Sequence, residues 1–308
     1  MKFNLTRGVV AGALVLAITV SVVSKGSNVP HQTSLLGDLS HVESSMLMCA
    51  ALDAGTSPVN GVVTFTNVSD ATRHVTATLS DGLHSVGAEW NVNAHESLTV
   101  RPSEYLPMTN ITVRAVVDGG GVSGVVRTTV GPTSSVPCYT NGTATWAVTG
   151  LHSKNGALAR VVVMNPTSTP SVINVTAWSS NGYLQIAPYQ GLVVPPVGQV
   201  TLNLSNYVVE ATDISVVVDA LRGHIVATAL QVDGRDGSLV GGQDELKTTQ
   251  WYPAVPTDSA ESVALNVLNP TSATADFRVV IDVPGFKIAP LRYSCLLYTS
   301  DAADDTPC

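Results

Sequence analysis

Few residues in this sequence of 308 amino acids combine the types and the spacing that catalysis needs. The best-matched pair is Asp118 and Asp219, which recur at equivalent places in two similar stretches, 101 residues apart. Glycoside hydrolysis uses such a pair of carboxylates, one as the acid and one as the base or nucleophile. Each aspartate, however, stands just before an expected hairpin turn, where aspartate is common. Since no recognisable nucleophile, base or metal set accompanies them, we expect no catalytic residue and no enzyme activity.

The other chemical motifs are absent or weak. No G-x-x-x-x-G-K-[ST] loop occurs, and the glycine-rich stretch DGGGVSG from Asp118 lies between two strand patterns, which favours a hairpin turn. The stretch DGRDG, residues 233–237, lacks a calcium loop with a distal glutamate and is also interpreted as a turn. The seven histidines show neither H-x-H nor H-x-x-x-H spacing. We therefore expect no metal site and no cofactor.

Two of the four cysteines have the spacing of a disulfide that joins the two ends of one domain. Cys49 and Cys138 stand 89 residues apart, and each lies at the edge of a β-rich region. A disulfide between them would join the first and last segments of one domain, and an exported chain permits it. In the chain-entropy model a loop this long stabilises by roughly 4 to 5 kcal/mol, less any strain. No C-x-x-C pair is present, so zinc ribbons and thioredoxin-like chemistry have no support.

Composition and charge limit the partners. Charged residues make up 12% of the chain and hydrophobic residues 44%, with 25 glycines and 17 prolines, a mixture that favours short strands over long helices. The net charge of −8 argues against nucleic acid as a partner, because few cations could neutralise its phosphates.

The N-terminal 23 residues have the pattern of an export signal. Lys2 and Arg7 precede an uncharged apolar run of 16 residues, from Gly8 to Val23. A spanning helix needs about 20 residues, and no A-x-A cleavage site follows the run. Two interpretations stay open: a cleaved signal peptide, or an uncleaved membrane anchor with its positive end inside. Either predicts that the rest of the chain is extracellular or part of the cell envelope.

The chain repeats itself with a period near 100 residues. The stretch NPTSTPSVINVTAW from Asn165 returns as NPTSATADFRVVID from Asn269, and a weaker copy begins at Asn67. Trp146 and Trp251 precede the two stronger copies by 19 and 18 residues, and we expect both to be core residues. A period this long is that of a domain rather than of a solenoid repeat.

Alternation within each copy gives the fold class. Residues 111–118, ITVRAVVD, alternate apolar and polar side chains with the period of a half-buried strand. Short strands between turns, in blocks of about 100 residues, predict an all-β protein of tandem antiparallel sandwiches with immunoglobulin-like proportions, behind an N-terminal hydrophobic helix. The Asn-Pro turn is interpreted as scaffold, because the asparagine side chain can hydrogen-bond the backbone just ahead.

The copies also set the expected boundaries. The expected segments are a signal peptide or anchor (1–23), a stalk (24–45), a first module (46–138), a second module (139–245), a truncated third module (246–293) and a tail (294–308). The tail contains SCLLYTSDAADD, which resembles the translated sequencing-adapter peptide that ends many reading frames from metagenome assemblies. We therefore expect residues 294–308, with Cys295 and Cys308, to be non-native.

The tryptophan strands, the stretches VVVMNPTS and VALNVLNPTS, and the paired SVVVDA and HIVATA strands also carry a resemblance. They resemble an uncharacterised family of secreted or membrane-anchored actinobacterial proteins with tandem β-sandwich modules, a domain of unknown function. The resemblance covers about residues 1 to 290 and implies no catalytic residues.

From these patterns we expect a non-catalytic structural or adhesive protein, secreted or held in the cell envelope. The alternative is an extracellular carbohydrate-binding or cell-wall-binding module. An exposed row of aromatic side chains would favour this alternative. The binding residues are unknown, although Trp90 or Trp178 would be candidates if exposed on a flat face. Expected partners are an envelope glycan or a surface protein, and the membrane through the N-terminal segment.

Overall fold

The computed structural model describes residues 44–52, 61–128, 134–180, 182–234, 236–244, 265–271, 273–283, 286–287 and 290–295. The chain divides into two units, Met1–Leu39 and Ser40–Cys308, and all the described residues belong to the second. The expected signal or anchor, most of the expected stalk, and residues 296–308 of the expected tail lie outside the described residues. Among the residues described, none lies in a helix long and apolar enough to cross a membrane.

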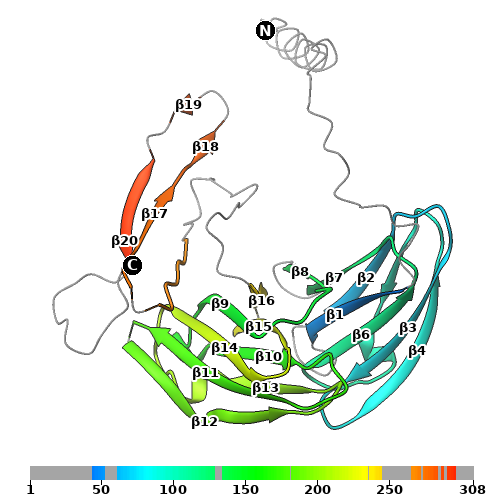
Figure 1. Ribbon diagram of the computed structural model, residues 1–308, viewed down its shortest axis with the longest axis horizontal. Helices are drawn as coiled ribbons and strands as arrows, with labels where there is room; N and C mark the ends of the chain where they lie inside the picture. Colours follow the sequence, from blue (N-terminus) through cyan, green and yellow to red (C-terminus); the bar gives the residue numbers. More distant parts are fainter. Residues whose placement is uncertain are drawn as a thin grey trace, which may run out of the picture. The chain divides into compact units, whose positions relative to one another are not determined.

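The first sandwich, which we call module 1 (residues 44–138), consists of two four-stranded antiparallel sheets (Figure 1). One sheet has the order β1 (Ser44–Leu52), β6 (Ile111–Asp118), β3 (Arg73–Ser80), β4 (Ser85–Val92). The other has the order β5 (Ser97–Val100), β2 (Gly61–Asn67), β7 (Val122–Thr128), β8 (Ser135–Pro137). Inward side chains such as Phe65, Leu79 and Val113 are fully buried between the sheets. A short 3-10 turn, η2 (Pro102–Glu104), leads into β6.

The second sandwich, module 2 (residues 139–244), repeats this arrangement strand for strand. Its first sheet has the order β12 (Gly182–Val194), β11 (Ser171–Ser179), β14 (Ile214–Arg222), β9 (Thr145–Leu151). Its second has the order β13 (Gln199–Asn203), β10 (Leu158–Met164), β15 (Val226–Asp233), β16 (Asp236–Gly241). The turns η3 (Lys154–Gly156) and η4 (Leu204–Asn206) complete it. Each strand of module 2 has the place of the strand eight numbers earlier, so the predicted all-β fold is confirmed.

The strand order refines the comparison with immunoglobulin domains. In the constant-type immunoglobulin fold the first strand pairs with the second, and the last pairs with the sixth. Here the first strand, β1, pairs with β6, and the seventh, β7, pairs with β2. The first and seventh strands have therefore exchanged sheets, and β1 forms the edge of its own sheet.

Two turn predictions are wrong, because neither Asp118 nor Asp219 precedes a hairpin. The strands around the turn after Asp219, β14 and β15, belong to different sheets. The stretch DGGGVSG does not form a hairpin, because β6 and β7 belong to different sheets and it carries the chain across the sandwich. Gly119 and Gly121 adopt φ values of 83° and 88°, which glycine accepts without strain. Alternation identifies strands but not their partners, and this is why the sequence suggested a hairpin. The DGRDG turn does join paired strands, since Asp233 of β15 lies opposite Asp236 of β16.

The repeated asparagine of the NPTS stretch is a buried structural clamp. In module 2 the Asn165 side chain is fully buried at the end of β10. Its amide Nδ2 donates to the carbonyls of Thr169, Val194 and Pro195 at 2.7, 3.2 and 3.0 Å. Its Oδ1 accepts bonds from the backbone N and the Oγ1 of Thr167, at 2.9 and 2.7 Å. One side chain thus fastens the β10–β11 crossing to the β12–β13 crossing.

The same asparagine clamp appears in module 1, and its local part appears in the third copy. Asn67, also fully buried, donates to the carbonyls of Ala71, Val92 and Asn93 at 2.8, 2.9 and 3.1 Å. In the third copy Asn269 Nδ2 donates to the Ala273 carbonyl at 2.7 Å, and its Oδ1 accepts from Thr271 Oγ1 at 2.7 Å. The predicted bond from the asparagine side chain to the backbone just ahead is therefore confirmed in all three copies.

The described part of the third copy is a hairpin. β17 (Ala275–Val279) pairs with β20 (Leu291–Cys295), and β18 (Asp282–Val283) pairs with β19 (Phe286–Lys287). This hairpin corresponds to β11 and β12 of module 2. Its strand β20 includes residues 294 and 295, the first two of the expected tail. Trp251 lies outside the described residues.

Modules 1 and 2 share apolar packing, which we call the seam. The outer face of the second sheet of module 2, which contains β10, β15 and β16, carries four buried side chains that belong to the core cluster of module 1: Val162, Leu230, Val232 and Leu239. In return, Met48 of β1 belongs to the core cluster of module 2. The two cores are therefore in contact through one sheet face rather than separated by a linker.

Candidate functional site

The disulfide lies where the chain leaves module 1. Cys49 is on β1, Cys138 directly follows β8, and their sulfur atoms are 2.03 Å apart. The backbone N–H of Cys138 donates to the Gly124 carbonyl of β7 at 2.8 Å. Next to the disulfide, Met48 and Tyr139 exchange two backbone bonds of 2.8 and 2.9 Å. Together these contacts hold the closing segment against the first strand and join the two sheets.

Module 2 closes in the same way without a disulfide. Ala147 of β9 and Gln243 exchange two backbone bonds of 2.8 Å. The neighbouring Trp146 is fully buried, as predicted, and its Nε1 donates to the Ile225 carbonyl at 2.5 Å. A Cβ on Gly242 would lie 2.8 Å from Trp146 Cε3, so the closing segment can pass over the indole only as glycine.

Tyr139 connects the two closures. Its ring meets the Trp146 ring edge-on, with centroids 4.6 Å apart. Its hydroxyl donates to the Gly242 carbonyl at 3.0 Å. Burial raises the pKa of Tyr139 to about 12, because the phenolate would lose its hydration here.

The carboxylates and histidines take part in local contacts. Asp219 Oδ1 accepts a bond from Thr145 Oγ1 at 2.8 Å, and Asp118, in module 1, is exposed. His84 Nδ1 lies 3.0 Å from Asp81 Oδ2, and His95 Nε2 lies 3.0 Å from Asp70 Oδ1, both at the surface. Within the described ranges, no group of three or more His, Cys, Asp or Glu side chains could hold a metal.

The two unmatched tryptophans differ in their surroundings. Trp90 is half-buried, with its ring 5.9 Å from Phe65 and 5.7 Å from Tyr105, and its Nε1 donates to Tyr105 Oη at 2.8 Å. Trp178 stands on the outer face of β11, where its ring lies 5.6 Å from that of Tyr183, which is 48% exposed. Among the described residues, this sheet face thus carries the half-buried Trp178 beside the exposed Tyr183.

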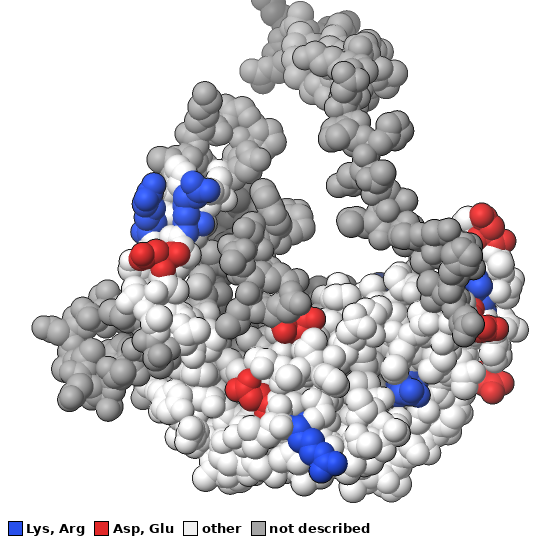
Figure 2. All heavy atoms as spheres, viewed as in Figure 1, with Lys and Arg blue, Asp and Glu red and all other residues white. Residues whose placement is uncertain are grey.

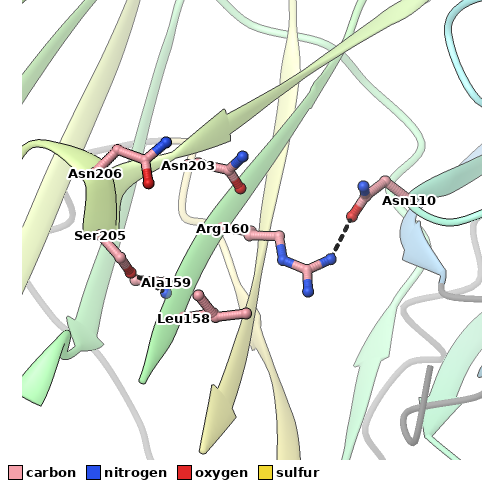
Figure 3. A pocket seen from close by; sticks show the side chains of 7 residues that line it. All are labelled: Asn110, Leu158, Ala159, Arg160, Asn203, Ser205 and Asn206. Atoms are coloured by element: carbon pink, nitrogen blue, oxygen red, sulfur yellow. Dashed lines mark hydrogen bonds between the residues drawn. The ribbon is translucent and has the colours of Figure 1, made fainter. Parts of the chain in front are cut away.

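A pocket of about 250 Å³ opens at the edge of the seam (Figure 3). We call it the seam pocket. Its lining includes Asn110, Leu158, Arg160, Asn203, Ser205 and Asn206.

Strand pairing brings the polar residues of the seam pocket together. Arg160 of β10 and Asn203 of β13 are direct cross-strand neighbours. Arg160 Nη1 donates to Asn110 Oδ1 of module 1 at 3.2 Å, and the Asn110 carbonyl accepts a bond from Gln199 Nε2. Ser205 is held by its own bonds, since its Oγ accepts from the Ala159 N–H at 2.7 Å. The sequence analysis missed this pocket, although a lone arginine within the apolar run ARVVVM was a signal for it.

Part of the chain matches the model of a protein family. Residues 133–285 match the model of a "Family of unknown function (DUF5719)". This stretch, which includes all of module 2 and part of the third copy, is therefore an uncharacterised domain of unknown function. No curated protein matches the chain.

One solved structure, red sea bream transglutaminase, matches at 13% identity with a TM-score of 0.15. The match covers 67% of this chain and 32% of the transglutaminase chain, so the chain spans about a third of that enzyme's length. A TM-score this low does not establish a shared fold.

Proposed function

We propose that this protein is a non-catalytic structural protein, exported to the cell envelope or secreted, in which two sandwiches act as one stiff unit. The observation that carries the proposal is the seam, where four apolar side chains of module 2 complete the core of module 1. Domains in one chain move relative to each other by default unless their interface is large and hydrophobic.

The contacts of the seam fit a stiff connection. Val162 and Leu230 are 0% and 1% exposed, and burying each such side chain stabilises by roughly 1.5 to 3 kcal/mol. Ser134 of module 1 also exchanges two bonds with Leu239 of module 2, of 2.9 and 3.1 Å. The backbone bonds between Met48 and Tyr139 leave no free linker between the modules.

The surface supports a structural rather than a catalytic role. Charged side chains are sparse on the face of the sandwiches shown in Figure 2. On the outer face of the second sheet of module 1, Thr64 and Thr99 join their hydroxyls at 3.0 Å, and Thr66 and Ser97 at 2.9 Å. Such cross-strand hydroxyl pairs stabilise an exposed sheet without charge.

Export is supported by two features. The N-terminal 23 residues have the charged and apolar regions of an export signal, and a structural disulfide persists mainly outside the reducing cytoplasm. Protease treatment of intact cells that express the full chain tests this part of the proposal. Cleavage of the sandwiches before lysis is expected, and full protection until lysis would contradict it.

The stiffness can be measured by spin-label distances in the full chain. We would label cysteines at two exposed positions, Leu83 of module 1 and Leu184 of module 2, with Cys295 and Cys308 replaced by serine. A narrow distance distribution is expected, and Leu230→Ser is expected to broaden it because the polar side chain weakens the seam. A broad distribution in the unmodified seam would contradict the proposal.

A second candidate function is extracellular carbohydrate binding. The observation in its favour is the exposed Tyr183, whose ring packs against the half-buried Trp178, since sugars stack on aromatic faces. A glycan array of the full chain beside Trp178→Ala tests it. Signals that disappear in the variant would support this function, and silence from both proteins would remove it.

A further inference from the structure

The seam joins two different parts of the repeated module. From module 1 comes the side of the sandwich between its edge strands β1 and β8, where β1 contacts β10 and β15 and β8 contacts β16. From module 2 comes the outer face of its second sheet, which carries Val162 and Leu230. We call the first part the open edge of a module and the second part its seam face. Because the two parts differ, the contact is head-to-tail, and a contact of this kind can repeat along a row of copies.

The seam face of module 1 has the character of an end. Judged from strand pairing and from the distance to the clamp asparagine, Thr64 has the place of Val162 and Arg127 has that of Leu230. The Thr64 hydroxyl bonds to that of Thr99 at 3.0 Å, and Arg127 is exposed. Terminal units of tandem arrays carry such a polar outer face, whereas internal units bury theirs. Module 1 therefore suits the first place in a stack of modules.

Module 2 has an open edge built like that of module 1. The edge strands β9 and β16 flank it, as β1 and β8 flank the open edge of module 1. The isolated bridge between Ala147 and Gln243 repeats the bridge between Met48 and Tyr139. The part of module 1 that receives a seam face is thus present again in module 2, one module later in the chain.

The third copy meets this edge at the position that the repeat predicts. Asn266 stands three residues before the clamp Asn269, as Val162 stands three residues before the clamp Asn165. A Cβ on Gly150 of β9 would lie 3.0 Å from Asn266 Nδ2. In the seam, Val162 belongs to the core cluster of module 1, and its strand β10 contacts β1. The same place of the next copy therefore meets the first strand of the preceding module in both cases.

Gly150 makes this close approach possible. It has a φ of 81°, which glycine adopts without strain. It lies at an irregularity in the pairing of β9 with β14, between Val148 and Leu151. A β-bulge of this kind bends a strand and re-aims it. A side chain at this position would strain the backbone and also take the space of the Asn266 amide.

The chemistry of this second contact differs from that of the seam. The buried Val162 of the seam is replaced by the amide of the half-buried Asn266, and Met164 is replaced by Leu268. A more polar contact gains less free energy from the burial of apolar area. The contact of the third copy is therefore expected to be weaker than the seam.

We propose that the third copy docks on the open edge of module 2 as module 2 docks on module 1, with Gly150 as the residue that admits it. The modules then stack head-to-tail in one direction, with module 1 as the cap. The proposal deepens the structural role and rests on it, because it takes the seam as the unit that repeats. The partner of the open edge is the next copy of the module in the same chain.

Spin-label distances in the full chain test the docking. One label replaces Leu184 of module 2 and the other replaces Val280 of the third copy, which is 58% exposed, with Cys295 and Cys308 changed to serine. A narrow distance distribution is expected. Gly150→Leu should roughly double its width, because the added side chain and the Asn266 amide cannot occupy the same space.

A second glycine of module 2 provides the matched control. Gly156 has a similar φ of 76°, but a Cβ there would meet nothing within 4 Å. Gly156→Leu should therefore bring the same backbone strain and leave the distance between Leu184 and Val280 narrow. Asn266→Lys approaches the contact from the other side and should broaden the distribution without touching the fold of module 2. It decides the question if Gly150→Leu does not fold.

Three results would overturn the docking. These are a broad distribution in the wild-type background, no broadening by either Gly150→Leu or Asn266→Lys, and equal broadening by Gly156→Leu and Gly150→Leu. The distance between labels at Leu83 and Leu184 separates this failure from failure of the proposed function. If that distance is narrow while the distance to Val280 is broad, the two-module unit stands and the docking of the third copy falls.

Discussion

Modules 1 and 2 have the same strand order but fasten their closing segments by different means. In module 1 the first strand is tied to the closing segment by the Cys49–Cys138 disulfide. In module 2 the fully buried Trp146, beside the same kind of backbone bridge, does this. The repeat therefore preserves a geometry rather than a set of residues.

The two fastenings stabilise the protein by acting on different states, one on the unfolded chain and one on the folded chain. A disulfide acts mainly by restricting the unfolded chain, and the effect grows with the length of the closed loop. A buried indole acts in the folded state, through apolar area and one hydrogen bond. The first depends on redox conditions and the second does not, so the two fastenings can be perturbed separately.

The largest expected effect concerns the feature that the modules share, the asparagine clamp. Asn165→Asp places a carboxylate against three carbonyl oxygens in a fully buried site, and should cost about 4 to 5 kcal/mol at neutral pH. Asn67→Asp should cost the same in module 1. Urea denaturation measures both, with the less buried Asn269→Asp as the control that should lose less. A loss of stability in only one of the two variants, Asn165→Asp or Asn67→Asp, would show that the clamps are not equivalent.

Removing the disulfide should cost about 4 kcal/mol. The Cys49→Ser/Cys138→Ser double variant frees a loop of 89 residues in the unfolded chain, which accounts for this magnitude. Urea denaturation of the wild type in reductant should reproduce the loss, and reductant should have no effect on the variant. A variant as stable as the oxidised wild type would contradict this account of module 1.

Alkaline pH should weaken the junction at Tyr139. Because its pKa is raised to about 12 in the folded state, folding favours the neutral phenol. The stabilisation is fully present below about pH 10, the unfolded value, and is lost as pH rises through the folded value. A shift of this size corresponds to roughly 2 to 3 kcal/mol. Tyr139→Phe should be less stable than the wild type at pH 8 but should lose less stability between pH 10 and 12. Parallel profiles of stability against pH for the two proteins would contradict this.

The smallest expected effect is that of Trp146→Phe. The variant keeps an aromatic ring but loses volume and the bond from Nε1 to the Ile225 carbonyl, at a cost of about 2 kcal/mol. Thermal melting should show the same loss with and without reductant, in contrast to the disulfide variant. A loss that appeared only in reductant would show that the two closures are coupled.

Part of this architecture could be predicted from the sequence, because it is encoded in local periodicity. Alternation over residues 111–118 predicted a half-buried strand, and the copies of the NPTS stretch predicted repeated modules. The clamp at Asn165 was foreseen as a bond to the backbone just ahead, but its reach to Val194 and Pro195 was not. Those carbonyls are about 30 residues away along the chain, and no local pattern indicates them.

The pairing of strands and the seam pocket could not be predicted, for related reasons. Gly119 and Gly121 suit a hairpin as well as a crossing between sheets, so only the fold decides between them. Arg160 and Asn110 meet because two modules pack together, although they are 50 residues apart and follow no spacing rule. Pocket residues that come from the packing of modules leave only a weak signal, here a charge within an apolar strand.

The central claim is that the two modules form one stiff, cooperative unit, and hydrogen exchange in increasing urea tests it most directly. Mass spectrometry would follow the amides of β3 in module 1 and of β11 in module 2 within the same full chain. The account predicts one common midpoint, with Leu230→Ala moving both strands to a lower urea concentration together, because that side chain lies in the seam. Two separate midpoints, or a shift in β11 alone, would contradict it.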